Sequence, residues 1–288
     1  MKATFKKLQQ PEKWKKIAIE RLTEPLHTNL ISAFVALFGS YRTKVFFDLV
    51  IRPQYAYSML RAADRAKELG LGSVTAVEFG VAAGDGLLNL CQIGACVTKV
   101  TGVKFQIAGF DTGKGMPPPL DYRDHPELYQ AGDFPMTDVQ ALRAALPANA
   151  KLVLGELRDT VPPFIDTLSE ETPLGFVALD VDYYSSSKDA LELLNHPNPL
   201  KYLPLPLLYL DDIMFESHNG WCGELLALTE FNDQHDFRKI ERDRFLRTRR
   251  ICKNPRWLDQ IYLLHVLDHS QMQQLRACRP PQQLNNPF

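Results

Sequence analysis

The 288-residue chain has few cysteines, no long apolar run and no excess of charge of either sign. Its five cysteines are an odd number without a CxxC pair, which argues against a disulfide framework or a zinc knuckle. The longest early apolar run, residues 30–38, contains Ser32 and is far shorter than the roughly 20 residues of a membrane span. We interpret it as a buried helix. The 33 basic and 34 acidic side chains nearly cancel, which argues against nucleic acid or an acidic membrane as a partner.

The N-terminus is rich in lysine, but it has no adjoining apolar segment and no cleavage site, so no export signal is predicted. Together with the lack of a disulfide pattern, this favours a reducing cytoplasm as the location. Residues 1–70 show no convincing strand pattern before 44–51 and end in an amphipathic helix pattern that stops at Gly70. We predict a helical N-terminal extension over 1–70, which covers the pocket or makes a dimer contact. The last residues, 271–288, are predicted to be a loose tail.

From residue 71 to 270, short apolar runs alternate with helical patterns. Most runs are apolar throughout, like strands buried on both faces of a parallel sheet, so we predict a doubly wound, mostly parallel seven-stranded α/β domain. The segment 117–135 is predicted to be a long functional loop. The predicted strands are 74–79, 106–110, 151–154, 175–179, 207–210, 237–250 and 260–266. The predicted helices are 86–97, 137–145, 187–194 and 223–232.

Each of the first five predicted strands ends in or is followed by a carboxylate, and ligands of an open parallel sheet bind beyond these ends. The first strand leads into a glycine loop that contains Gly80, Gly84 and Gly86. Its acidic neighbours Glu78 and Asp85 would repel a pyrophosphate and attract a cation, which favours S-adenosylmethionine over a dinucleotide. The alternative is a packing turn that binds nothing.

Asp111 follows the second strand, where an acidic residue accepts hydrogen bonds from the ribose hydroxyls of an adenosine ligand. The alternative role is a helix cap or turn, since Asp-Thr-Gly is also turn chemistry. Gly155 and Glu156 follow the third strand and would then lie on the adenine side of the pocket.

The fourth and fifth strands are followed by Asp180 and Asp182 and by Asp211 and Asp212. Like charges at neighbouring strand ends are unfavourable unless a cation compensates them, so we predict a divalent ion here. Oxygen ligands favour Mg²⁺, or Mn²⁺ or Ca²⁺, over zinc. Helix capping by Asp182 and Asp212 is the alternative.

In their order along the chain, these motifs resemble the macrocin O-methyltransferase family, class I S-adenosylmethionine-dependent enzymes that methylate sugar hydroxyls. The resemblance covers residues 74–232 and rests on EFGVAAGDG, GFDTGKGMP, GDF, LVLGELRDTVP, ALDVDYYSSSKDAL and LYLDDI. It implies a Rossmann-like methyltransferase fold and a Mg²⁺ site made by Asp180, Asp211 and Asp212, with Asp182 as a supporting or substitute ligand. The chain departs from the family at Lys114 and Ile213, on the substrate side.

A methyltransferase acting on a small hydroxylated acceptor also needs a general base. His125 in the long loop and His218 after the Asp pair are the candidates, although a lone histidine is more often structural. Two other functions stay open. Asp180-Val181-Asp182 is also a DxD motif, as in glycosyltransferases that bind Mn²⁺ and a sugar nucleotide, and a methyltransferase fold can serve as a non-catalytic binding module.

Residues 238–256 hold nine basic residues against two acidic ones. They could face RNA or a phosphorylated substrate. We favour the alternative, a solvated strand pair whose bases pair with acids elsewhere, and the scarcity of aromatic residues argues against single-stranded RNA.

Overall fold

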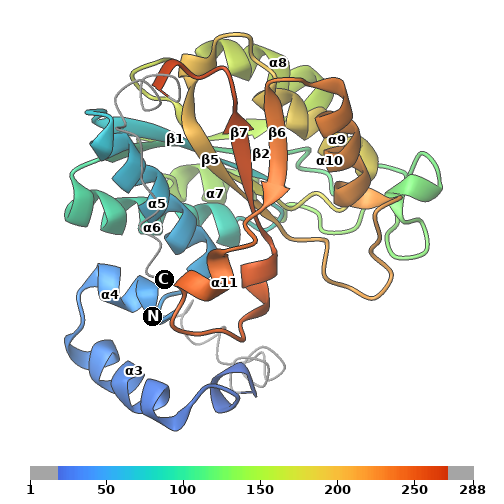
Figure 1. Cartoon of the computed structure of the whole chain (residues 1–288). Coiled ribbons are helices and arrows are strands. Elements are labelled where there is room, and N and C mark those ends of the chain that lie inside the picture. Colours follow the sequence, from blue (N-terminus) through green and yellow to red (C-terminus); the bar gives the residue numbers. More distant parts are fainter. Residues whose placement is uncertain (1–18, 272–288) are drawn as a thin grey trace, which may run out of the picture.

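The computed structural model describes residues 19–271, and its centre is a seven-stranded sheet between two layers of helices (Figure 1). The strand order is β3-β2-β1-β4-β5-β7-β6. The first five strands pair in parallel, and β7 runs antiparallel to both of its neighbours. The predicted doubly wound, mostly parallel sheet is therefore confirmed. The strands are β1 Ser73–Phe79, β2 Lys104–Asp111, β3 Ala150–Leu154, β4 Leu174–Leu179, β5 Tyr202–Leu210, β6 Arg238–Arg242 and β7 Ile261–Val266.

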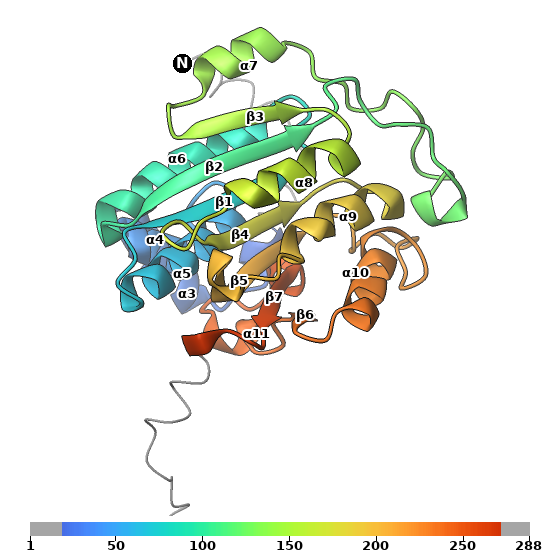
Figure 2. The same ribbon diagram turned by 90° about the horizontal axis from the view of Figure 1, so that it is seen from above.

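The central strands bury both of their faces, which is why they read as continuous apolar runs. In β1, Val74 and Ala76 face one core with α5 (Pro53–Glu68) and α6 (Asp85–Thr101). Val77 and Phe79 face the other core with α8 (Leu157–Thr167), α9 (Tyr184–Leu191) and α10 (Gly223–Gln234). Figure 2 shows these two layers from above. The helices are α3 Leu26–Phe38, α4 Tyr41–Phe46, α5 Pro53–Glu68, α6 Asp85–Thr101, α7 Val139–Ala145, α8 Leu157–Thr167, α9 Tyr184–Leu191, α10 Gly223–Gln234 and α11 Leu246–Arg249.

Four predicted helices are confirmed as α6, α7, α9 and α10. The helix α8 was not predicted, because Pro162 and Pro163 lie inside it and proline normally opposes a helix interior.

Two sequence predictions were wrong. The segment 237–250 is not one strand, because Asp243 accepts a hydrogen bond from the backbone of Phe245 and starts a turn that leads into α11. Residues 30–38 form a helix as predicted, but its large apolar side chains are exposed instead of buried. In addition, residues 44–51, the first segment with a possible strand pattern, form no strand, since Ser40 caps the short helix α4 and a turn follows it.

The N-terminal extension is fixed to the rest of the chain by polar contacts. Arg21 donates hydrogen bonds to the carbonyls of Phe47 and Asp48, at 2.6 and 2.9 Å. Glu24 accepts the backbone N–H groups of Lys253 and Asn254, at 2.6 and 2.9 Å. Further along, α5 packs against the sheet and is part of one helical layer.

Within residues 19–271, no helix is both long enough and apolar enough to cross a membrane. The predicted loose tail, residues 271–288, lies outside the described part of the chain except for Gln271. The four cysteines within the described part, Cys91, Cys96, Cys222 and Cys252, are free thiols.

Candidate functional site

Three aspartates meet where β4 and β5 end. Asp180, Asp211 and Asp212 each offer a carboxylate oxygen, and these three oxygens lie within 4.8 Å of one another. The parallel pairing of β4 with β5 places the residues after both strands at one edge, and Asp211 N–H donates to the carbonyl of Leu179 at 3.0 Å. The structure thus brings together the three residues predicted as metal ligands.

A fourth carboxylate, from Glu224 in the first turn of α10, completes the acidic cluster. Glu224 is fully buried, and one of its oxygens accepts the backbone N–H of Asp212 at 3.3 Å. Among the described residues, Glu224 Oε1 and Asp212 Oδ2 have no hydrogen-bond partner. Glu224 was not predicted from the sequence, because no motif marks it and only the return of the chain after Ile213 brings it here.

The cluster is strongly disfavoured in its charged form. Burial, reinforced by Glu224 and the neighbouring aspartates, raises the pKa of Asp212 to about 11. Burial and the nearby acids also hold the pKa values of Asp180 and Glu224 well above their ordinary range. Buried carboxylate oxygens without partners are what a hard divalent cation would satisfy, so the residues present fit Mg²⁺ or Mn²⁺.

Asp182 lies beside the cluster in a left-handed backbone conformation, with φ at 59°. Its pKa is raised by burial, an effect that hydrogen bonds with Tyr129 and Asp212 oppose. Asp182 thus lies beside one predicted ligand, and Tyr129, which no sequence motif marks, is a further residue of this site.

Glu78 forms a second buried acidic position next to this cluster. The Tyr55 hydroxyl donates to Glu78 Oε1 at 2.8 Å, and Glu78 Oε2 has no partner among residues 19–271. Burial raises the pKa of Glu78 to about 7. Arg52, at the start of α5, is a cation that lies close enough to Glu78, Asp180 and Asp211 to interact with all three charges. The acids outnumber it, so this edge of the sheet favours cationic ligands.

The glycine loop connects β1 to α6 and requires glycine at two contacts. Gly80 has φ at +83°, and a Cβ there would lie 1.7 Å from the carbonyl oxygen of Asp180. A Cβ on Gly86 would lie 2.1 Å from Glu78 Oε1. Gly84 precedes the first helical residue, Asp85, whose side chain is exposed. The loop thus lets α6 begin directly against Glu78.

Asp111 organises this loop. It accepts the backbone N–H groups of Val81, Ala82 and Gly113, at 3.0, 2.8 and 2.6 Å. The turn role considered for Asp111 is therefore present, and one acceptor position of its carboxylate is left over. Gly155 N–H donates to the Asp111 carbonyl at 3.0 Å, and exposed Glu156 follows at the start of α8. The predicted cofactor residues all lie at one edge of the sheet.

The two histidine candidates, distant in sequence, are neighbours. The rings of His125 and His218 have centroids 5.2 Å apart. His125 is buried and its Nδ1 lies 2.9 Å from Glu127 Oε1. Both ring nitrogens of His218 lack a partner among the described residues. Burial and His125 lower the pKa of His218, and they outweigh the charges of Asp211 and Glu127, which raise it. The imidazole of His218 is therefore neutral at pH 7.

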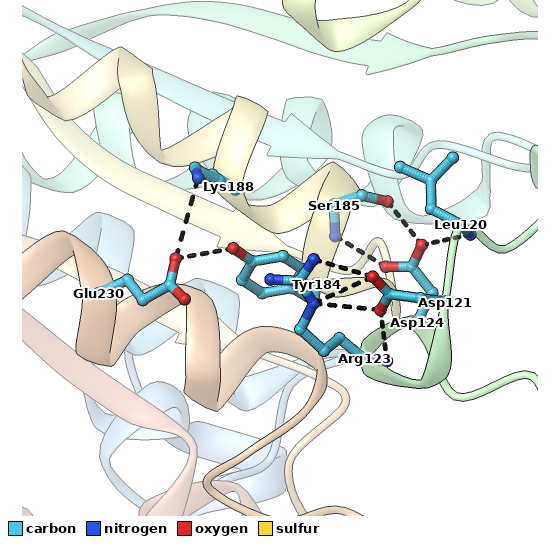
Figure 3. A network of polar contacts seen from close by, with 8 residues as sticks. All are labelled: Leu120, Asp121, Arg123, Asp124, Tyr184, Ser185, Lys188 and Glu230. Atoms are coloured by element: carbon cyan, nitrogen blue, oxygen red, sulfur yellow. Dashed lines mark hydrogen bonds and ion pairs between the residues drawn. The ribbon is translucent and has the colours of Figure 1, made fainter.

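The long loop is fastened to α9 and α10 by a polar network (Figure 3). Asp124 accepts hydrogen bonds from the backbone N–H of Ser185 at 2.8 Å, from the Ser185 hydroxyl at 3.0 Å and from the backbone N–H of Leu120 at 2.9 Å. The Arg123 guanidinium lies 4.4 Å from the ring centre of Tyr184, whose hydroxyl donates to Glu230. This attachment brings His125 and Tyr129 to the acidic edge.

The basic segment 238–256 is largely paired with acids, although it does not form the strand pair of the favoured interpretation. Six of its arginines form ion pairs. Most pairs are local, but Arg250 reaches the buried Asp48. The paired arginines are Arg238, Arg242, Arg244, Arg247, Arg249 and Arg250.

No protein-family model matches the chain, and no curated protein is detectably similar to it. Solved structures do resemble it. CalS11, a calicheamicin methyltransferase, is 20% identical, with 72% of this chain and 83% of that chain covered and a TM-score of 0.46. The cmcI-D160 Mg-SAM structure is 18% identical, with 70% of this chain and 69% of that chain covered and a TM-score of 0.36. An O-methyltransferase from Bacillus cereus in complex with SAH is 10% identical, with 75% of this chain and 80% of that chain covered and a TM-score of 0.37. These likenesses concern the fold.

Proposed function

We propose that this chain is an S-adenosylmethionine-dependent O-methyltransferase that needs a divalent cation, Mg²⁺ in the first place. The observation that carries the proposal is the convergence of Asp180, Asp211 and Asp212 within 4.8 Å, beside buried acid oxygens without partners. The resemblance to macrocin O-methyltransferases directs the search for the acceptor to hydroxyls of sugars or glycosylated natural products.

The acidic edge supports S-adenosylmethionine as the methyl donor. This molecule carries an ammonium and a sulfonium and has no phosphate, so buried Glu78 and the acidic cluster favour it. The glycine loop allows close approach of a ligand to the backbone, and the acceptor position left on Asp111 suits a ribose hydroxyl. A nucleoside diphosphate carries no positive group that these acids could bind.

The reaction forms a bond between the methyl carbon and the acceptor oxygen while the bond from that carbon to sulfur breaks, and the acceptor hydroxyl loses its proton. A divalent cation would supply a Lewis acid that lowers the pKa of this hydroxyl. Asp180, Asp211 and Asp212 would hold that cation, and Asp182 would hold Asp212 in place. Glu78 would bind the cationic donor and Tyr55 would orient Glu78.

We propose His218 as the group that accepts the proton. Its ring nitrogens have no partner within residues 19–271, and its depressed pKa keeps it neutral. His125 is placed to support it, because Glu127 occupies the Nδ1 side of His125 and the His125 ring packs against that of His218. The fastened loop would exclude water from this side.

Calorimetric titration with S-adenosylmethionine and with a UDP-sugar, each with and without Mg²⁺, tests the proposal. We expect binding of S-adenosylmethionine and none of the UDP-sugar. The reverse result would assign the DxD glycosyltransferase function instead. A methyl-transfer assay then compares Asp211→Asn/Asp212→Asn with the wild type, and the exposed Asp233→Asn on α10 is the matched control. If the double variant transfers methyl groups as well as the wild type does, the cation has no role in the reaction. Failure to find any transfer with a panel of hydroxylated acceptors, despite donor binding, would favour a binding module.

A further inference from the structure

The helix α3 exposes its large apolar side chains and buries only three residues, none of them large. Thr28, Ser32 and Val35 are the buried residues of this helix. The exposed residues recur every three or four positions and so share one side of the helix. They are Leu26 (76% exposed), Leu30 (66%), Phe34 (64%), Leu37 (75%) and Phe38 (73%), and we call them the α3 apolar face. A helix that only covers the core of its own chain buries its apolar residues and exposes its polar ones.

A polar contact near the start of α3 holds this orientation. Asn29 donates to the carbonyl of Arg21 at 2.9 Å, and Arg21 is itself bound to the carbonyls that follow α4. The buried hydroxyl of Ser32 has no partner among the described residues, which is unfavourable. The side of α3 that is packed on the protein therefore contributes little to stability, and most of the apolar surface of the helix lies on the exposed side.

The α3 apolar face carries no charge that would oppose contact with a copy of itself. No Asp, Glu, Lys or Arg lies between Glu24 and Arg42. In a two-fold dimer each surface meets the same surface of its partner, so any charge near the axis would face its own copy. An uncharged apolar face is complementary to itself. The rings of Phe34 and Phe38, 5.0 Å apart, supply the aromatic centre that such interfaces use.

We infer that the α3 apolar face binds the α3 apolar face of a second copy and makes a homodimer. Contiguous exposed apolar patches of this kind are rare on monomeric proteins. A lipid surface is the weaker candidate, because an interfacial helix keeps a face with Lys or Arg in water, whereas the polar face of α3 is packed against the chain and has neither residue. In Figure 1, α3 lies at the lower edge, apart from the long loop and α10 at the right. The dimer would leave the acidic edge accessible.

Sedimentation velocity over a wide range of concentrations tests this inference on the full chain. The wild type is expected to shift with concentration from its chain mass of 32.7 kDa to twice that mass. Phe34→Glu would place like charges across the axis and should raise the dimer dissociation constant by at least about 100-fold. Leu30→Ser should weaken the dimer without adding charge. Leu120→Glu, on the long loop and 79% exposed, is the matched control and should leave the dimer intact. Far-ultraviolet circular dichroism confirms that each variant is folded.

Four results would overturn the inference. The first is a wild type that is monomeric at every concentration. The second is a folded Phe34→Glu variant with the same mass distribution as the wild type. The third is a wild type that stays monomeric and co-sediments with phosphatidylglycerol vesicles, whereas Phe34→Glu does not. This result would assign the face to lipid. The fourth is a dimer that appears only after deletion of residues 1–18, which would assign the face to that segment of the chain.

Discussion

Asp124 of the long loop accepts hydrogen bonds from both the backbone N–H and the hydroxyl of Ser185, 61 residues further along the chain. Asp124 is almost completely buried, and its third bond, from the N–H of Leu120, closes the loop on itself. This pair joins the loop to the start of α9, so the positions of His125 and Tyr129 depend on it.

Asp124→Ala is therefore expected to free the loop while the sheet stays folded. Three donors would lose their acceptor, and we expect a loss of stability of about 1–3 kcal/mol. Hydrogen exchange of residues 117–135 should accelerate by at least about tenfold, whereas exchange in β1 and β4 should not change. Tyr122→Ala, which removes a 70% exposed side chain two residues away, is the control. Equal protection of the loop in the Asp124 variant and the wild type would contradict this role.

Gly86→Ala is expected to weaken donor binding strongly. A Cβ at this position would lie 2.1 Å from Glu78 Oε1 and would displace the carboxylate from Tyr55. We expect the dissociation constant for S-adenosylhomocysteine, measured by calorimetry, to rise by at least about 100-fold. Gly72→Ala is the matched control, because a Cβ there has no atom within 4 Å. Unchanged binding by a folded Gly86 variant would remove Glu78 from the donor site.

The stability of the metal-free protein is expected to fall as pH rises. The pKa of Glu78 is about 7 in the fold against an ordinary value of 4.5, so the folded state holds more protons than the unfolded state between these values. Its contribution is fully present below pH 4.5 and is lost as pH rises through 7, by about 3 kcal/mol. The raised pKa values of Asp180, Asp212 and Glu224 continue the loss at higher pH.

Magnesium should oppose this loss, because it binds the deprotonated carboxylates and so competes with protons. Melting temperatures at pH 5, 6, 7 and 8, with EDTA or Mg²⁺, provide the measurement. The rise in melting temperature caused by Mg²⁺ should grow with pH and should vanish in Asp211→Asn/Asp212→Asn. A metal-free protein that becomes more stable from pH 5 to 8 would refute the assignment of these buried acids.

His218→Asn is expected to slow methyl transfer by about 10²–10⁴-fold without loss of donor binding. Burial lowers the pKa of His218, so the acid limb of the wild-type kcat profile should lie below the ordinary value of about 6.5. This limb should disappear in the variant. His265→Asn, on β7, serves as the control. A variant that keeps both the rate and the acid limb would shift the base role to another group.

The parallel strands and the acids that follow them could be predicted because burial on both faces leaves continuous apolar runs, and parallel strand ends necessarily meet. Asp180, Asp211 and Asp212 converge for that reason. Glu224 and Tyr129 could not be predicted, since chain returns distant from the motifs place them. The spacing in 30–38 predicts a helix, but spacing alone does not say which side faces the protein.

Crystals grown with Mn²⁺ and S-adenosylhomocysteine provide the most direct test of the central claim. The anomalous difference map is predicted to show one manganese peak among the carboxylates of Asp180, Asp211 and Asp212, with the nucleoside on the glycine loop between Glu78 and Asp111. A map with no peak at the three aspartates, or with the nucleoside elsewhere, would contradict the account.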